Sequence, residues 1–140
     1  MNIYFACSIT GGREDEPVYQ EIVAALQADG HEVPTALLAG SDVIEIEVIV
    51  DPVTVYNRDT GWIEGCDLLV AEVSTPSHGV GYEIGYALNL RKRVLCLHRE
   101  GVSVSKMITG NLDPNLKVQE YTDGRQAVQQ LRAYLKNADG

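Results

Sequence analysis

Apolar runs of strand length alternate with longer segments of helical periodicity along the chain. The runs are rich in leucine, β-branched and aromatic residues, and we interpret them as five strands, at 2–7, 31–38, 66–73, 93–98 and 116–121. Apolar residues at helical spacing predict longer helices at 17–29, 52–64, 83–93 and 124–137. This alternation favours an α/β fold, with a parallel sheet and helices on both of its faces.

Residues typical of helix starts support two of these helices. Pro17 suits the first turn of a helix capped by Asp15 or Glu16. Asp51 and Pro52 supply a cap and a first helical position for the second helix.

The stretch 44–50 carries a different pattern. Isoleucine and valine alternate there with Glu45 and Glu47, and a period of two predicts a half-exposed strand, with an extended flap as the alternative. Residues 103–110 predict only a short helix.

The order of the strands determines which loops meet. Five-stranded doubly wound sheets of the flavodoxin or Rossmann type commonly follow the order 2-1-3-4-5, and ligands bind beyond the carboxyl ends of the strands at the switch point. The first and third strands are then neighbours, so the loops at 8–13 and 74–83 lie against each other. Both loops are rich in glycine and hydroxyl residues. Without repeats or linkers, 1–140 is expected to form a single domain with its ligand site between these loops.

Composition and charge limit the partners of such a domain. The chain has 140 residues, 45% of them hydrophobic, and a formal net charge of −9, which is typical of a folded globular protein. An acidic excess argues against a nucleic-acid polymer or a membrane surface as partner. A single small phosphate stays compatible, since backbone N–H groups can hold it whatever the net charge.

Cysteine and histidine spacing gives no metal site. The three cysteines have no C-x-x-C spacing and lie in or beside apolar runs, so we expect buried, reduced thiols. The three histidines show no ligand spacing, and neither a metal nor an organic cofactor is expected. No apolar run approaches a membrane span and the N-terminus has no signal-peptide pattern, so a cytoplasmic location is expected.

The first glycine-rich loop is a candidate phosphate site. Ser8, Thr10, Gly11 and the backbone N–H groups around them follow a strand and precede a helix, with Arg13 nearby as a cation. The sequence is neither a P-loop nor a dinucleotide fingerprint, and a plain strand-to-helix turn is an equally good interpretation.

Three further residues are candidates for chemistry. Glu83 is expected in the first turn of a helix, where the macrodipole favours an ionised carboxylate suited to nucleophilic attack or to stabilising a cation, although simple capping explains it too. Asp59 lies near the middle of a helix, as a second acid or as a solvated surface residue. Tyr4 is either a core aromatic or a hydroxyl pointing at the site.

Three parts of the chain carry a resemblance to a known family: IYFACSITGGRED at 3–15, the segment that begins at Asp59 and ends in CDLLVAEVSTPSHGVGYEIGYAL at 66–88, and KRVLCLHRE with VSKMITG at 92–110. They resemble the 2'-deoxynucleoside 5'-monophosphate N-glycosidases, within the nucleoside 2-deoxyribosyltransferase superfamily. The resemblance covers nearly the whole chain in order, and 35–57 is the region that matches least.

The resemblance implies a reaction and a role for each candidate. Glu83 would attack the anomeric carbon of the deoxyribose, Asp59 would assist proton transfer as the base leaves, and Tyr4 would position nucleophile and sugar. The nucleotide and its phosphate would be held by Ser8, Ile9, Thr10, Gly11, Arg13, Ser77, Gly79, Ser105 and Met107. Ser105 would come from the neighbouring subunit of a homodimer.

One departure and two alternatives accompany this interpretation. Thr10 stands where a close relative has an arginine, which bears on phosphate affinity or base selectivity. The chemistry would suit hydrolysis through a carboxylate nucleophile, as in retaining glycosidases. A deoxyribosyltransferase that passes the sugar to a second base, or a non-catalytic nucleotide-binding module, are the alternatives.

Overall fold

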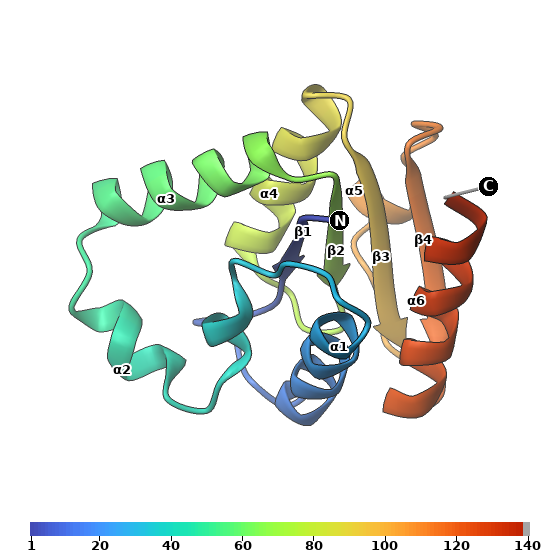
Figure 1. Ribbon diagram of the computed structural model, residues 1–140, viewed down its shortest axis with the longest axis horizontal. Coiled ribbons are helices and arrows are strands. Elements are labelled where there is room, and N and C mark those ends of the chain that lie inside the picture. Colours follow the sequence, from blue (N-terminus) through green and yellow to red (C-terminus); the bar gives the residue numbers. More distant parts are fainter. Residues whose placement is uncertain (139–140) are drawn as a thin grey trace.

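Four parallel strands form the sheet at the centre of the computed structural model, which describes residues 1–138 (Figure 1). The strands are β1 (Ile3–Ala6), β2 (Leu68–Glu72), β3 (Arg93–Arg99) and β4 (Leu116–Tyr121), in the order β1-β2-β3-β4. Every residue of β1 and β2 is buried, as the near-continuous apolar runs predict for parallel strands covered on both faces.

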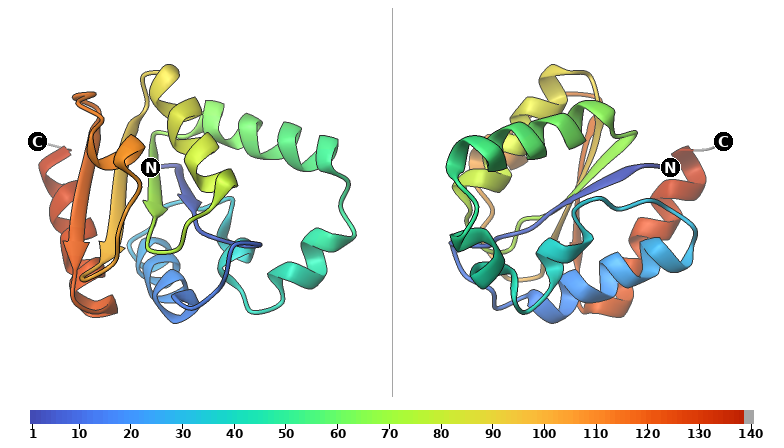
Figure 2. Two further views of the ribbon diagram at one scale, coloured as in Figure 1. Left: turned by 180° about the vertical axis from the view of Figure 1, so that it is seen from behind. Right: turned by 60° about the vertical axis from the view of Figure 1, so that its left-hand side comes forward.

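Helices lie on both faces of this sheet (Figure 2). α1 (Glu16–Ala28) and α6 (Gly124–Ala138) lie side by side on one face, and α3 (Pro52–Gly65) and α4 (His78–Asn89) cover the other. The connections hold three short elements: η1 (Ala36–Ala39), α2 (Val43–Val48) and α5 (Lys106–Thr109). Within residues 1–138, no helix combines the length and apolar character that a bilayer crossing requires.

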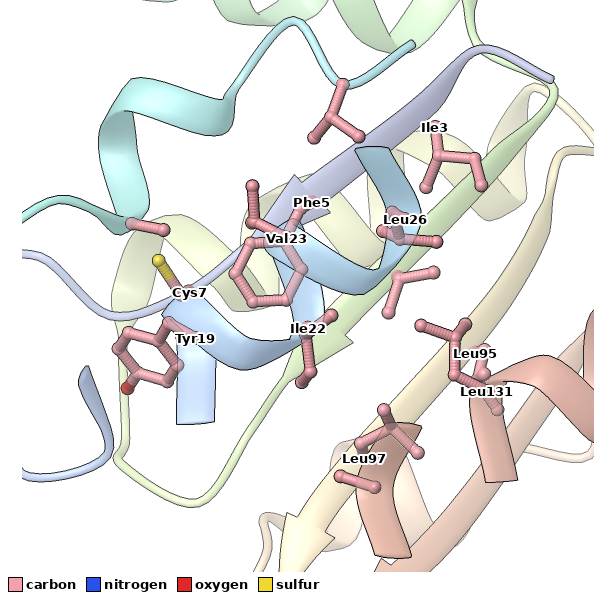
Figure 3. Packing of buried hydrophobic residues seen from close by; sticks show 14 of the residues in the cluster. Ile3, Phe5, Cys7, Tyr19, Ile22, Val23, Leu26, Leu95, Leu97 and Leu131 are labelled. Atoms are coloured by element: carbon pink, nitrogen blue, oxygen red, sulfur yellow. The ribbon is translucent and has the colours of Figure 1, made fainter. Parts of the chain in front are cut away.

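The alternation of side chains along β1 divides the core in two. Ile3, Phe5 and Cys7 face α1 and α6 (Figure 3), whereas Tyr4 and Ala6 face α3 and α4. The apolar stripe predicted for the first helix is confirmed, because its four members are all buried: Tyr19, Ile22, Val23 and Leu26.

The prediction of five strands is wrong, because the run at 31–38 does not form a strand. It makes one isolated parallel bridge, between Glu32 and Asn2, and then turns into η1. Pro34 has no N–H to give to a ladder, and the Thr35 hydroxyl accepts the N–H of Phe5 at 3.0 Å where a strand carbonyl would otherwise do so. The run still lies beside β1, so β1 and β2, the first and third predicted strands, are neighbours as expected.

The stretch 44–50 is not a strand, and it is not an extended flap either, because helix α2 covers most of it. A helix satisfies its own backbone groups instead, beginning with the N–H of Ile46, which donates to the carbonyl of Asp42. Only Val43 is buried in α2, and the alternating isoleucines and valines are therefore partly exposed.

The predicted helix starts are confirmed with one difference. Asp51 caps α3 and its carboxylate accepts the N–H of Thr54 at 3.0 Å. Asp15 stands at the N-cap of α1 without a side-chain cap bond, because its carboxylate pairs with Arg99 at 3.1 Å.

Candidate active site

The loops that follow β1 and β2 meet at the carboxyl edge of the sheet. Gly11 in the first loop lies so close to Pro76 in the second that a Cβ at Gly11 would collide with the Pro76 carbonyl oxygen. The same Cβ would be 3.1 Å from the Ser8 hydroxyl. Glycine is therefore required at this position by the close approach of two backbones. The loops predicted to meet are in contact.

Polar groups of these two loops form a small cradle. The Ser8 side chain is fully buried, and its hydroxyl has no hydrogen-bond partner within residues 1–138. Ser77 caps α4 and accepts the N–H of Val80 at 3.3 Å, so the first turn of a 12-residue helix begins here. Unpaired N–H groups at such a helix end, together with a hydroxyl, are suited to an anion such as phosphate. Gly79 keeps the space beside the Ser77 hydroxyl open.

Glu83 lies in the second turn of α4, so the prediction of a first-turn position is wrong. The helix begins earlier than expected because Ser77 caps it and His78 is already helical. The helix macrodipole acts mainly on the first turn, and it is not the principal influence on this carboxylate. The principal influence is burial, which raises the pKa of Glu83 from 4.5 to about 7.

Tyr4 and Asp59 are the groups that act on Glu83 from β1 and α3. The Tyr4 hydroxyl interacts with the Glu83 carboxylate and lowers its pKa, whereas the charge of Asp59 raises it. Burial, reinforced by the charge of Glu83, keeps the pKa of Tyr4 far above its ordinary value. Of the two interpretations of Tyr4, the structure supports both at once, because its ring belongs to the core while its hydroxyl faces Glu83.

Asp59 is half-buried and is held by its sequence neighbour. Arg58 donates from Nε to Asp59 Oδ1 at 2.8 Å and from Nη2 to Glu47 Oε1 at 3.0 Å, and its guanidinium stacks on Trp62. Burial raises the pKa of Asp59, and Arg58 counteracts this. A buried acid paired with a cation is not the solvated surface residue that the sequence left as an alternative. Arg58 itself was missed, although its place beside Asp59 was the available signal.

The guanidinium of Arg13 is committed elsewhere. It donates to the backbone carbonyls of Ser8, Leu38 and Gly40 at 2.8–3.0 Å and pairs with Glu16 at 2.9 Å. These bonds tie the loop after β1 to η1. The role of Arg13 as a phosphate cation stays a prediction, with most of its donors already engaged.

Several of the predicted contact residues line a cavity that shares Gly11 and Ser77 with the cradle. It has a volume of about 850 Å³ and runs along the side of α4 that carries Ile84 and Leu88; Tyr4, Asp59 and Glu83 do not line it. Its walls bring together predicted residues from three segments: Thr10, Gly11, Ser77, Ser105 and Met107. Ile9 is partly exposed in the first loop and does not line this cavity.

These arrangements define a class of site. At the carboxyl edge of a parallel α/β sheet, a largely desolvated carboxylate has a tyrosine and a second acid beside it, next to an anion cradle. Such a carboxylate can capture a cationic sugar carbon. No cluster of three potential metal ligands occurs in the part of the chain that the structure describes.

The family model of nucleoside 2-deoxyribosyltransferase matches residues 3–111, and the chain belongs to this family. The 5-hydroxymethyl-dUMP N-hydrolase of Esox lucius is 43% identical over 129 residues, covering 88% of each chain. The protein of that name from Danio rerio is 41% identical over 126 residues, again with 88% of each chain covered. The solved CMP N-glycosidase BcmB of Clostridium botulinum has the same fold, with a TM-score of 0.72 at 22% identity over 94% of this chain and 98% of that one.

Proposed function

We propose that this protein hydrolyses the N-glycosidic bond of 2'-deoxynucleoside 5'-monophosphates. The observation that carries the proposal is Glu83, a buried carboxylate that faces Tyr4 and has Asp59 nearby. The anion cradle of Ser8, Gly11 and Ser77 lies beside it, on the other side of Gly79. The names of the relatives, N-hydrolases of a deoxynucleoside monophosphate, support the same class of reaction.

In the first step, a carboxylate oxygen of Glu83 forms a bond to the anomeric carbon while the bond from that carbon to the base breaks. The electron pair goes to the base, which takes up a proton delivered through Asp59. Water then attacks the same carbon and gives a proton to the Asp59 carboxylate, which lost one in the first step; 2-deoxyribose 5-phosphate leaves and the Glu83 carboxylate is regenerated. Since the pKa of Glu83 is about 7, a substantial fraction is ionised at neutral pH.

The cradle supports a position for the 5'-phosphate of the substrate. The hydroxyls of Ser8 and Ser77 and the N–H groups that begin α4 would bind the 5'-phosphate, with Gly11 allowing the two loops to approach. A nucleoside without phosphate would leave the buried Ser8 hydroxyl unpartnered, so the monophosphate is the expected substrate.

The test is to incubate the protein with each deoxyribonucleoside and ribonucleoside 5'-monophosphate, and with the matching nucleosides, and to follow base release by chromatography. We expect release from the deoxynucleotides and none after Glu83→Ala. A second free base is added in a parallel series. Formation of a new nucleoside there, without preference for a 5'-phosphate, would favour the deoxyribosyltransferase, and binding without turnover would favour the non-catalytic module.

We also propose that the active form is a homodimer. Met107 is 84% exposed and Leu112 is 93% exposed, beside a cavity with apolar walls. Large exposed apolar side chains around a concave apolar surface are typical of an interface. A second copy would bury them. The chain's own Ser105 lines the same cavity as Gly11 and Ser77, so the proposal that the partner's Ser105 reaches this cradle needs a test that separates the two copies.

Mixing two impaired variants tests this sharing. Glu83→Ala and Ser105→Ala proteins are combined and allowed to exchange subunits. If Ser105 acts across the interface, the mixed dimer contains one intact site and activity at low substrate concentration rises above the sum of the separate variants. If both residues act within one chain, no such rise occurs. Light scattering of the wild-type protein checks the mass of the assembly.

A cytoplasmic location completes the proposal. Cys7, Cys66 and Cys96 are buried as unpaired thiols, which suits a reducing compartment.

A further inference from the structure

One side chain links the catalytic carboxylates to a helix that the reaction scheme does not use. The Arg58 guanidinium contacts Asp59 in α3 at 2.8 Å and Glu47 in α2 at 3.0 Å. The side chains of these three residues are only 14–22% exposed, so water screens the pairs less than it would at the surface. The guanidinium also stacks on Trp62, 5.0 Å from the ring centroid. Its position is therefore fixed on three sides.

Helix α2 has few other attachments. It is six residues long, Val43 is its only buried residue, and Val48 is 78% exposed. Within residues 1–138, the ion pair between Glu47 and Arg58 is the salt bridge that joins α2 to the rest of the protein. Helices as short as α2 are not stable by themselves and depend on such tertiary contacts.

We propose that Arg58 is a positioning residue that couples the docking of α2 to the orientation and charge of Asp59, so that the acid pair is correctly arranged only while α2 is docked. This inference rests on the function proposed above and deepens it. When Glu47 holds one arm of the guanidinium, the other arm is directed at Asp59. When α2 moves away, Arg58 gains freedom and Asp59 loses a fixed partner.

The electrostatic part of the coupling involves five groups. Glu47 faces Arg58 from α2, Asp59 from α3, Glu83 from α4 and Tyr4 from β1. The positive charge of Arg58 lowers the pKa of Asp59 and of Glu83, while Glu47 raises the pKa of Asp59. Loss of Arg58 therefore makes both acids harder to ionise, and the acid limb of the activity profile moves to higher pH.

Three variants separate position from charge. Arg58→Gln removes both; Arg58→Lys keeps the charge but cannot hold two carboxylates with a planar fork. Glu47→Gln removes the ion pair that holds α2 and keeps the charge of Arg58, which can still contact Asp59 but is no longer held from α2. We expect Arg58→Gln to lower kcat about tenfold and to raise the acid limb. Arg58→Lys should lower kcat without moving that limb, and Glu47→Gln should lower kcat less than Arg58→Gln does. An Arg58→Gln enzyme with wild-type kcat and pH profile would overturn the proposal.

Two further measurements do not depend on catalysis. Trp62 is the single tryptophan of the chain, so its emission reports the stacked guanidinium directly. Hydrogen exchange across 43–48 reports the docking of α2. Arg58→Gln and Glu47→Gln should both speed exchange there several-fold, and Arg58→Gln should also change the Trp62 emission. Unchanged exchange in Arg58→Gln contradicts the coupling even if no nucleotide is hydrolysed, which keeps its failure distinct from failure of the proposed function.

Arg132→Gln is the matched control, because Arg132 pairs with Asp29 on the exposed outside of α1 and α6. It removes a guanidinium and an ion pair of similar length. Exchange across 43–48, Trp62 emission and the pH profile should all stay as in the wild type.

Discussion

Two glutamates near the carboxyl edge of the sheet, Glu83 and Glu72, have similarly raised pKa values but different hydrogen-bond partners. Burial is the largest influence on both, and it raises the pKa of Glu83 and of Glu72 from 4.5 to about 7. Glu83 belongs to α4 and faces Tyr4. Glu72 ends β2 and meets Tyr121, on the face of the sheet that α1 and α6 cover.

The difference lies in how much of each carboxylate is already used. Glu72 is fully buried; one oxygen accepts the N–H of Ser74 at 2.6 Å and the other accepts the Tyr121 hydroxyl at 3.3 Å. Glu83 is less deeply buried, and Gly79 leaves room beside it. A raised pKa therefore does not identify a nucleophile. The proposed nucleophile, Glu83, differs by an open oxygen next to the cradle, whereas Glu72 holds in place the loop that leads to that cradle.

Neutralising each glutamate in turn should show the largest difference between their roles. Glu83→Gln should lower kcat at least ~10³-fold, because the amide cannot form the bond to the sugar. Glu72→Gln should keep kcat within about threefold, since an amide oxygen still accepts the Ser74 N–H. Steady-state kinetics on a deoxynucleoside monophosphate measures both. Equal losses would mean that the two sites are not functionally distinct.

The free energy of unfolding should depend on pH more steeply in the wild type than in Glu72→Gln. The folded protein holds a proton on Glu72 between pH 4.5 and about 7, where the unfolded chain has lost it. This contribution to stability is fully present below pH 4.5 and is lost as pH rises through 7, a difference of about 3 kcal/mol. Denaturant unfolding at pH 5 and pH 8 should show a steeper decline for wild type than for the variant. Parallel declines would mean that Glu72 titrates normally.

The two tyrosine partners offer a smaller and more selective test. Tyr4 lowers the pKa of Glu83, so Tyr4→Phe should raise it, move the acid limb to higher pH and lower kcat/KM about tenfold at pH 6. The loss should shrink at pH 8. Tyr121→Phe removes the equivalent partner of Glu72 and should leave the pH profile of kcat/KM unchanged. A shift in both profiles would show that the two faces communicate.

Glycine substitutions give the smallest expected effects. A Cβ at Gly11 would collide with the Pro76 carbonyl, so Gly11→Ala should separate the two loops and raise KM about fivefold, by weakening phosphate contacts worth about 1 kcal/mol. Gly61 lies inside α3 with open space around it, and Gly61→Ala should stabilise the protein by ~0.5–1 kcal/mol without changing KM. Steady-state kinetics and thermal unfolding of both variants test whether only the substitution at Gly11 weakens substrate binding.

The parts of the fold that the sequence predicted are those in which local pattern and burial agree. The buried run at 66–73 forms a strand between two layers, and the apolar residues of α1 lie on one buried face. At 31–38, Pro34 and the Thr35 hydroxyl interrupt a strand beside β1, through a contact 30 residues distant in the chain. The stretch 44–50 alternates like a strand, but helix α2 covers 43–48 and buries only Val43.

For the site, residue types and loop neighbourhood were predictable and side-chain partners were not. The meeting of the two glycine-rich loops follows from strand order, and contact of Gly11 with Pro76 confirms it. The contact of Arg13 with the Leu38 carbonyl and the contact of Arg58 with Glu47 depend on how η1 and α2 fold. These are the segments whose secondary structure was wrongly predicted.

The Thr35 hydroxyl also protects the chain against aggregation through the edge of its sheet. β1 is an edge strand, and an edge with unpaired N–H groups is a template on which another chain can add a strand. Here Ile3 donates to Glu32 and Phe5 donates to Thr35, so these donors are already satisfied within the chain. In other proteins a lysine, a proline or a bulge protects such an edge. Here a hydroxyl and the Glu32 carbonyl occupy the donors, so another strand cannot pair with them.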